Sequence, residues 1–344
     1  MYTRKMVSVV SKVLTVSIAA YNVESYIKET IESLLIPEIL DDLEVFIIDD
    51  GGKDKTYSIA KEYEEKYPGT FHAVHKENGG WGSTVNYSIS NATGKYFRLL
   101  DGDDYFDREG LRDLIGLLNS IDTDVVYTSY RRFDDKTRRI VETFSASDNV
   151  IRNKTIPVSQ TNGKDFVMHS STFRTKILQD NKIRITEHCF YTDNEYRTKG
   201  MAFVQTAYIT NLCVYQYRVG REGQSIDITG IKKHYKDNLE VLKELIRFEA
   251  NLPKTCNISM VNNNIDSVIE YHYNNLIIIG NKSEYKEFDN QMLNLHRDSN
   301  VTEKSLLKLA RSTNYRFFAL ISLGLKTRIS FARKVKTIVS RVSG

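Results

Sequence analysis

Three carboxylates surround one glycine in the stretch Asp101-Gly102-Asp103-Asp104, directly after the apolar run of residues 96–100. Carboxylates this close repel one another, so their clustering suggests that a cation binds among them. Carboxylate and diphosphate oxygens are hard ligands, which favour Mg²⁺ or Mn²⁺ over Zn²⁺. The pattern predicts a metal and diphosphate site, whereas the plainer alternative is a solvated turn in which acidic side chains cap the backbone.

Two earlier segments share this layout and favour the metal site over the turn. The apolar run 44–48 ends in Asp49-Asp50-Gly51-Gly52, and the apolar run 13–20 ends in Tyr21-Asn22. Helical patterns separate these runs. Strands that alternate with helices and end in polar groups are typical of an open α/β sheet that binds its ligand at the carboxyl ends of its strands.

The alternation continues along the first 130 residues and predicts a mostly parallel sheet with right-handed crossovers. Residues 130–220 are less regular and more polar, which is typical of a half-domain that shapes a substrate pocket. Long periodic segments then predict a helical region. The expected strands are 13–20, 44–49, 71–74, 96–101 and 124–128, and the expected helices are 25–35, 55–66, 83–91, 108–119, 231–249, 258–279, 284–296 and 303–311.

Composition excludes several classes of protein. The 344 residues are 41% hydrophobic and 27% charged, which is ordinary for one large globular domain or two smaller ones. Three cysteines without a C-x-x-C spacing indicate neither a disulfide framework nor a zinc site. No signal peptide is recognisable, and no apolar run approaches the roughly 20 residues that span a bilayer. We therefore expect a cytoplasmic protein.

The charge is unevenly distributed. Residues 304–344 hold ten Lys or Arg and no Asp or Glu, so the net charge of +4 leaves about −6 for the first 303 residues. Drawn as a helix, residues 325–342 place most apolar side chains on one side and most basic ones on the other. Such a helix can lie on an anionic membrane, or it can pack on the acidic body or on a second copy of the chain as a homodimer. No nucleic-acid motif accompanies the tail, so nucleic acid is not expected as a partner.

Residues 13–220 resemble the family-2 glycosyltransferases, which are inverting, nucleotide-sugar-dependent enzymes with the GT-A fold. The resemblance implies an α/β GT-A fold, a mostly parallel nucleotide-binding sheet flanked by helices, with a helical C-terminal region. It divides the chain into a catalytic domain (1–225, with a nucleotide-sugar half at 13–128 and an acceptor half at 129–225), a helical region (226–312) and the basic tail (313–344). The motifs that carry it are 17–22, 49–54, 78–80, Asn86, Ala92, Gly94, Tyr96, 101–104, 192–196, 215–218 and 225–226.

The same resemblance implies a UDP-sugar donor and a bound Mn²⁺ or Mg²⁺. Asp103 and Asp101 would hold the metal, and Asp50 would accept the ring N–H of uracil. Many relatives have an Arg before the residue matched by Asn86, where this chain has Val85, so Lys76 or Arg218 would have to replace that diphosphate contact. The nucleotide-sugar residues expected from the motifs are Ala20, Tyr21, Glu24, Asp50, Lys76, Asn78, Gly79, Asp101, Gly102 and Arg218.

Inversion requires a base that takes the proton from the acceptor hydroxyl, and Asp193 matches the acidic catalytic motif. An ordinary carboxylate at a helix N-terminus is the alternative, with Glu195 and Glu187 as competing bases. His169, Trp81 and Tyr217 are weaker candidates for the acceptor site, since each could equally be structural.

The Gln-x-x-Arg-Trp motif of processive synthases is absent from the sequence, which favours addition of one sugar per encounter. The resulting hypothesis is a metal-dependent hexosyl- or N-acetylhexosaminyltransferase at the inner face of the cell membrane. Its acceptor would be a hydroxyl of a growing, lipid-linked surface glycan. The alternatives are a soluble transferase with a protein or small-molecule acceptor, and a non-catalytic GT-A module that acts in assembly.

Overall fold

The computed structural model describes residues 12–161, 163–221, 228–279, 283–284 and 287–288. Four parallel strands form one half of its sheet, in the order β3 (Phe71–His75), β2 (Leu43–Asp49), β1 (Leu14–Ala20) and β4 (Tyr96–Asp101). The register pairs Ala20 with Asp49 and Ala19 with Asp101. The polar residues that follow these strands therefore meet at one edge of the sheet, as the sequence predicted.

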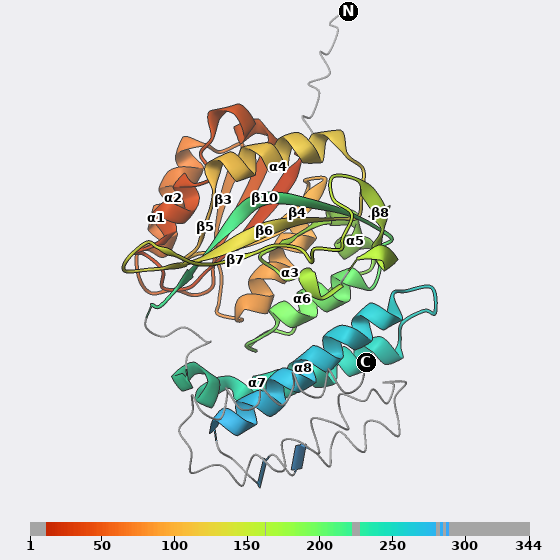
Figure 1. Ribbon diagram of the computed structural model, residues 1–344. Coiled ribbons are helices and arrows are strands. Elements are labelled where there is room, and N and C mark those ends of the chain that lie inside the picture. Colours follow the sequence, from red (N-terminus) through yellow and green to blue (C-terminus); the bar gives the residue numbers. More distant parts are fainter. Residues whose placement is uncertain (1–11, 162, 222–227, 280–282, 285–286, 289–344) are drawn as a thin grey trace, which may run out of the picture.

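Apolar side chains cover both faces of these strands, because helices pack on each side. Figure 1 shows α4 (Arg108–Ser120) above the sheet and α3 (Trp81–Asn91) below it. The Asp107 side chain caps α4 by accepting a hydrogen bond from the Gly110 N–H at 2.8 Å. The helix α2 (Thr56–Lys66) packs against β2 and β3. The helix α1 (Ile27–Glu32) is shorter than predicted, because the chain turns into a 3₁₀ helix at Pro37–Asp42.

The region 130–220 is more regular than the sequence predicted. Its longest element, β10 (Thr206–Val219), pairs in parallel with β6 (Val125–Asp134), which itself extends beyond its predicted end at residue 128. The polar residues of β6 and β10 obscured the apolar pattern expected of buried strands. Several of these polar residues form hydrogen bonds inside the protein instead of facing solvent. The other elements of this region are β7 (Ile140–Phe144), β8 (Thr155–Pro157), β9 (Ser171–Arg174), 3₁₀ turns at Val158–Gln160 and Gly163–Asp165, α5 (Thr175–Asp180) and α6 (Asp193–Met201). The two-residue strand β5 (Tyr105–Phe106) precedes this region and pairs with β10.

Two long helices follow and agree with their predicted ranges. The helices α7 (Ile228–Ala250) and α8 (Ile258–Ile279) pack on each other and on α6 around a second apolar core. They lie beyond α6 from the sheet (Figure 1). The GT-A-like α/β fold with C-terminal helices is thus confirmed. In the part of the chain that the structure describes, no helix has the length and apolar character needed to cross a membrane.

Part of the sequence prediction falls on residues that the structure does not describe. Residues 284 and 287–288 are helical, in agreement with the helix expected at 284–296. The rest of that helix, the helix at 303–311 and the basic tail lie outside the described residues, as do residues 225–226 of the last motif.

We expect Glu44→Ala to destabilise the fold, because the buried Glu44 carboxylate joins β1 and β2 to the turn before β4. It accepts hydrogen bonds from the Thr15 hydroxyl at 2.6 Å and from the backbone N–H and hydroxyl of Thr93 at 2.8 and 2.6 Å. Leaving these donors unpaired should lower the free energy of unfolding by about 2–4 kcal/mol. Urea denaturation measures this, with the exposed Glu62→Ala as a control expected to change it by less than about 0.5 kcal/mol. An equal effect of both variants would contradict this role for Glu44.

Candidate active site

Asp104 is the structural member of the acidic cluster. Its buried carboxylate accepts hydrogen bonds from the Tyr215 hydroxyl at 2.6 Å and from the backbone N–H of Arg218 at 2.7 Å. Both donors lie on β10. Burial, together with the charges of Asp103 and Asp101, raises the pKa of Asp104 well above its usual range. Asp104 therefore fastens the acidic loop to β10.

Asp101 stands at the end of β4 with little charge compensation. The indole N–H of Trp81 donates to its carboxylate at 2.9 Å. Burial and the charge of the neighbouring Asp103 together raise the pKa of Asp101 to about 7, against the opposing effect of the hydrogen bond from Trp81. A cation bound beside Asp101 would stabilise the ionised carboxylate, which burial and Asp103 disfavour.

Asp103 already pairs with a positively charged side chain. Its carboxylate forms an ion pair with Arg221, whose Nε lies 2.5 Å from Oδ2. Its backbone carbonyl accepts a hydrogen bond from the Nε of Arg218 at 2.6 Å. The side chain of Asp103 is 13% exposed. Arg218 thus fixes the backbone at this position, while the carboxylate meets a second arginine.

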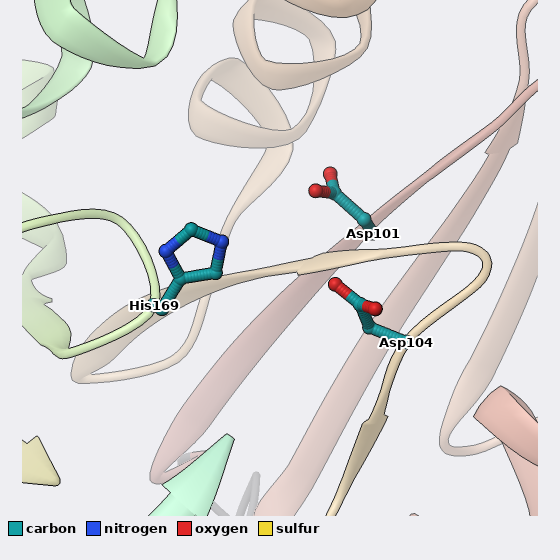
Figure 2. Close-up of side chains that lie close together, drawn as sticks. All are labelled: Asp101, Asp104 and His169. Atoms are coloured by element: carbon teal, nitrogen blue, oxygen red, sulfur yellow. The ribbon is translucent and has the colours of Figure 1, made fainter. Parts of the chain in front are cut away.

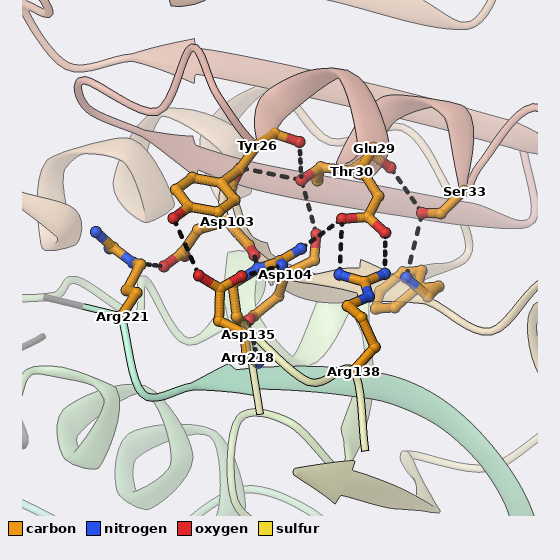
Figure 3. Close-up of polar contacts among 12 residues, drawn as sticks. Tyr26, Glu29, Thr30, Ser33, Asp103, Asp104, Asp135, Arg138, Arg218 and Arg221 are labelled. Carbon is orange, nitrogen blue, oxygen red and sulfur yellow. Dashed lines mark hydrogen bonds and ion pairs between the residues drawn. The ribbon is translucent and has the colours of Figure 1, made fainter. Parts of the chain in front are cut away.

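The guanidinium of Arg218 is fully used in holding the protein together (Figure 3). It forms ion pairs with Glu29 on α1 and with Asp135 after β6, the latter at 2.7 Å. It also lies over the rings of Tyr26 and Phe133, at 4.7 and 4.9 Å from their centroids. Its side chain is only 3% exposed. Arg218 could either contact the diphosphate or pair with carboxylates inside the protein, and this geometry is the second of these.

His169 faces the same space as two carboxylates of the cluster. Ring and carboxylate atoms of His169, Asp101 and Asp104 lie within 4.8 Å of one another (Figure 2). The imidazole is stacked between Tyr130 and Tyr217, with ring centroids 5.2 and 4.6 Å away. Burial lowers the pKa of His169 to about 3, so the ring is neutral. The structure thus brings His169 and Tyr217 together beside Asp101.

The donor set is compatible with a hard divalent cation. Of the residues that the structure describes, ligand atoms of Asp101, Asp104 and the neutral His169 lie within 4.8 Å of one another, whereas Asp103, which the sequence predicted as a metal ligand, is not part of this group. Asp104 is a weaker ligand than its position suggests, since its oxygens already accept two strong hydrogen bonds. Among the described residues, no protein donor other than Trp81 contacts the carboxylate of Asp101, which leaves one of its oxygens for a metal.

The carboxylate of Asp50 organises the loop that precedes α3. It accepts hydrogen bonds from Lys76 Nζ at 2.9 Å, from the backbone N–H groups of Gly79 and Gly80 at 2.9 and 2.7 Å, and from the Ser83 hydroxyl at 3.1 Å. Asn78 donates to the Asp50 carbonyl at 2.7 Å. Lys76 also donates to the Ser83 hydroxyl at 2.9 Å. The structure therefore gathers Asp50, Lys76, Asn78 and Gly79 at one edge, bonded to each other.

The remaining predicted donor residues lie around the ends of β1 and β4. Ala20 is buried, and its carbonyl accepts a hydrogen bond from the Asp50 N–H at 2.9 Å. Tyr21 is 53% exposed and so is available to a ligand. Glu24 accepts a hydrogen bond from the Lys55 N–H at 2.8 Å. Gly102 admits no side chain, because a Cβ atom there would lie 2.9 Å from the Ala19 carbonyl oxygen.

Asp193 is the first residue of α6 and lies within electrostatic reach of Asp101. Burial raises the pKa of Asp193 to about 6, against the opposing effects of Arg197 and the N–H groups at the helix start. Glu195 is fully buried and paired with Lys199 at 2.9 Å, and it accepts the Thr186 N–H at 3.0 Å. Glu187 is exposed and accepts a hydrogen bond from Asn86 at 3.0 Å. Of the three acids, Asp193 combines a raised pKa with proximity to the acidic cluster.

Residues 15–181 match the family model described as Glycosyl transferase family 2. By this match, residues 15–181 belong to the family. An uncharacterized glycosyltransferase of Rickettsia typhi is 35% identical over 132 residues, which cover 38% of this chain and 40% of the relative. The match thus spans about two fifths of that protein's length.

Two other similar proteins have informative names. The minor teichoic acid biosynthesis protein GgaB of Bacillus subtilis is 40% identical over 85 residues, or 24% of this chain and 9% of GgaB. The crystal structure of S. aureus TarS residues 1–349 in complex with UDP-GlcNAc has a TM-score of 0.58 and 19% identity, and the match covers 89% of this chain and 90% of that one. The likeness to TarS shows a shared fold.

Sequence reasoning missed Arg221 and Glu29, which shape the site, and gave Tyr215 only as part of the motif at 215–218. Tyr215 and Arg221 reach Asp104 and Asp103 from β10 and the residues just after it. Glu29 pairs with Arg218 from α1. In the sequence, only the Tyr and Arg residues clustered at 215–221 pointed to this part of the site. Contacts between segments more than 100 residues apart leave no periodicity that could reveal them.

We expect Arg218→Gln to destabilise the protein, because two carboxylates and the Asp103 carbonyl lose their hydrogen-bond donor. Since Glu29 and Asp135 are partly exposed, the loss should be about 2–3 kcal/mol in the free energy of unfolding. The exposed Arg112→Gln on α4 is the control and should be near neutral. If Arg218→Gln left stability unchanged and weakened only UDP binding, Arg218 would contact the nucleotide-sugar donor, as the motif implied.

Proposed function

We propose that this family-2 protein is an inverting glycosyltransferase that moves one sugar from a UDP-sugar to a hydroxyl of a surface glycan. The observation that carries the proposal is that Asp101, at the end of β4, lies within electrostatic reach of both Asp103 in the loop after it and Asp193 at the start of α6. Two of them suit a cation and the third suits a base. The arrangement supports direct displacement of UDP by the acceptor hydroxyl.

The residues of the acidic loop would position the donor's diphosphate. A bound Mn²⁺ or Mg²⁺ held by Asp103 and Asp101 would neutralise the charge that grows on the departing UDP. Trp81 orients Asp101 through its indole N–H rather than offering that group to an acceptor sugar. Arg218 and Asp104 hold the loop in place, so the carboxylates are preorganised before a donor arrives.

Asp193 would act as the base. With a pKa of about 6 it is mostly ionised at neutral pH, yet it is basic enough to take a proton from an attacking hydroxyl. His169 and Tyr217 would contact the acceptor, because both lie near Asp101. Tyr21 would face the uracil ring and the ribose of the donor, since it is exposed just after the end of β1.

The donor and acceptor proposals draw on the named relatives. TarS binds UDP-GlcNAc in its crystal structure, so UDP-GlcNAc is the first donor to test. GgaB acts in minor teichoic acid biosynthesis, which makes a cell-surface polymer or its lipid-linked precursor the first class of acceptor. Both choices rest on similarity over part of the chain or on the fold.

Asp193→Asn tests the base directly. The amide is nearly isosteric but cannot take the proton, so turnover with UDP-GlcNAc should fall by about 100-fold or more while UDP affinity is retained. In the wild type, kcat/KM should fall as the pH drops below about 6, since protonation of Asp193 removes the base. Steady-state kinetics and calorimetry measure these quantities.

Glu195→Gln is the matched comparison for Asp193→Asn. Because Glu195 pairs with Lys199 in the interior, its loss should lower the free energy of unfolding by about 2–4 kcal/mol. The folded fraction should keep its turnover within a few-fold of the wild type. A large loss of turnover in well-folded Glu195→Gln, with Asp193→Asn active, would instead assign the base to Glu195.

We also propose that the basic tail binds the anionic inner face of the cell membrane. Residues 313–344 contain seven Lys or Arg and no acidic residue, and each basic residue near an anionic surface contributes about 1 kcal/mol. Replacing the seven with Gln should abolish co-sedimentation with anionic vesicles at moderate salt and leave UDP-sugar hydrolysis unchanged. If the full chain ignores such vesicles, and light scattering shows that the substitutions disrupt a dimer, the tail serves subunit packing instead.

A further inference from the structure

Two arginines near the end of β10 reach the same acidic loop but are held very differently (Figure 3). Arg218 is 3% exposed and has fixed partners in Glu29, Asp135 and the Asp103 carbonyl. Arg221 follows three residues later, is 29% exposed, and forms its ion pair with the Asp103 carboxylate itself. Its guanidinium also lies near the Tyr26 ring, 5.7 Å from the centroid. Arg221 is the more accessible of the two.

The ion pair of Arg221 uses an oxygen that a cation would need. The Nε of Arg221 lies 2.5 Å from Oδ2 of Asp103, which is hydrogen-bonding distance. A guanidinium and a divalent ion repel each other, so the two compete for the same carboxylate oxygen. Asp101, Asp103 and Asp104 lie within four residues of the chain and repel one another, so the loop needs a positive charge both with and without a metal.

We propose that Arg221 is an exchangeable counter-ion for the acidic loop. It pairs with Asp103 in the cation-free enzyme and leaves this carboxylate when a divalent cation binds. Arg221 thereby keeps the loop ordered without metal and, by the same pairing, weakens the binding of metal alone. This inference rests on the proposed role of Asp103 as a metal ligand.

Binding of Mn²⁺ to the full chain without nucleotide provides the test. Mn²⁺ is titrated, and the free ion is followed by electron paramagnetic resonance or the heat by calorimetry. Arg221→Gln removes the competing charge, so the Kd for Mn²⁺ should fall by about three- to tenfold, the size expected for a partly exposed ion pair. Arg221→Lys keeps the charge and should bind Mn²⁺ within about twofold of the wild type.

Arg138→Gln is the matched control. Arg138 belongs to the same network and pairs with Glu29, but it does not contact Asp103 among the described contacts. Its Kd for Mn²⁺ should therefore stay within about twofold of the wild type. A tightening equal to that of Arg221→Gln would mean that general electrostatics, and not competition at Asp103, sets the affinity, and would overturn the inference.

Asp103→Asn separates failure of this inference from failure of the proposed function. If Asp103→Asn loses Mn²⁺ binding but Arg221→Gln does not tighten it, the metal site stands and the counter-ion role is wrong. If Asp103→Asn binds Mn²⁺ as the wild type does, the proposed metal site itself is wrong. Thermal unfolding checks that each variant is folded. If Arg221→Gln does not fold, Arg221→Ala is used to repeat the test.

Discussion

Repulsion among three carboxylates within four residues is the constraint on which the site depends. The loop 101–104 follows a buried parallel strand, where water cannot screen its charges. Each carboxylate meets this constraint differently. Asp104 is bonded to β10, Asp103 pairs with Arg221, and Asp101 has a pKa raised to about 7 beside the Trp81 indole. These differences divide the cluster into one structural group and two groups suited to a cation.

The strand β10, which is 14 residues long, makes this division possible. It pairs with β6 and β5, and it delivers the Tyr215 hydroxyl and the Arg218 backbone to Asp104. Arg218 then joins α1 and the residues after β6 to the same loop. An acidic loop held from several elements in this way can remain ordered before any ligand binds, which is the condition for electrostatic preorganisation.

Much of the first half of the fold was predictable from the sequence, because periodicity reports local structure. The strands β1, β2 and β4 and the helices α7 and α8 lie where apolar periodicity placed them. The strand β10 was not predicted, because its polar residues are satisfied by partners far along the chain. The candidate site shows the same limit. The acidic cluster and Asp193 were visible as motifs, whereas the hydrogen bonds of Asp50 to its neighbouring loop and the pairing of Arg218 with Glu29 depend on tertiary contacts.

In the proposed function, Asp101 and Asp103 bind a divalent cation together with the diphosphate of UDP. The direct test is the affinity of the full chain for UDP, measured by calorimetry with saturating Mn²⁺ and again with a chelator. Mn²⁺ should tighten UDP binding by about tenfold or more, and Asp103→Asn should remove this gain. Equal UDP affinity with and without Mn²⁺ would contradict it.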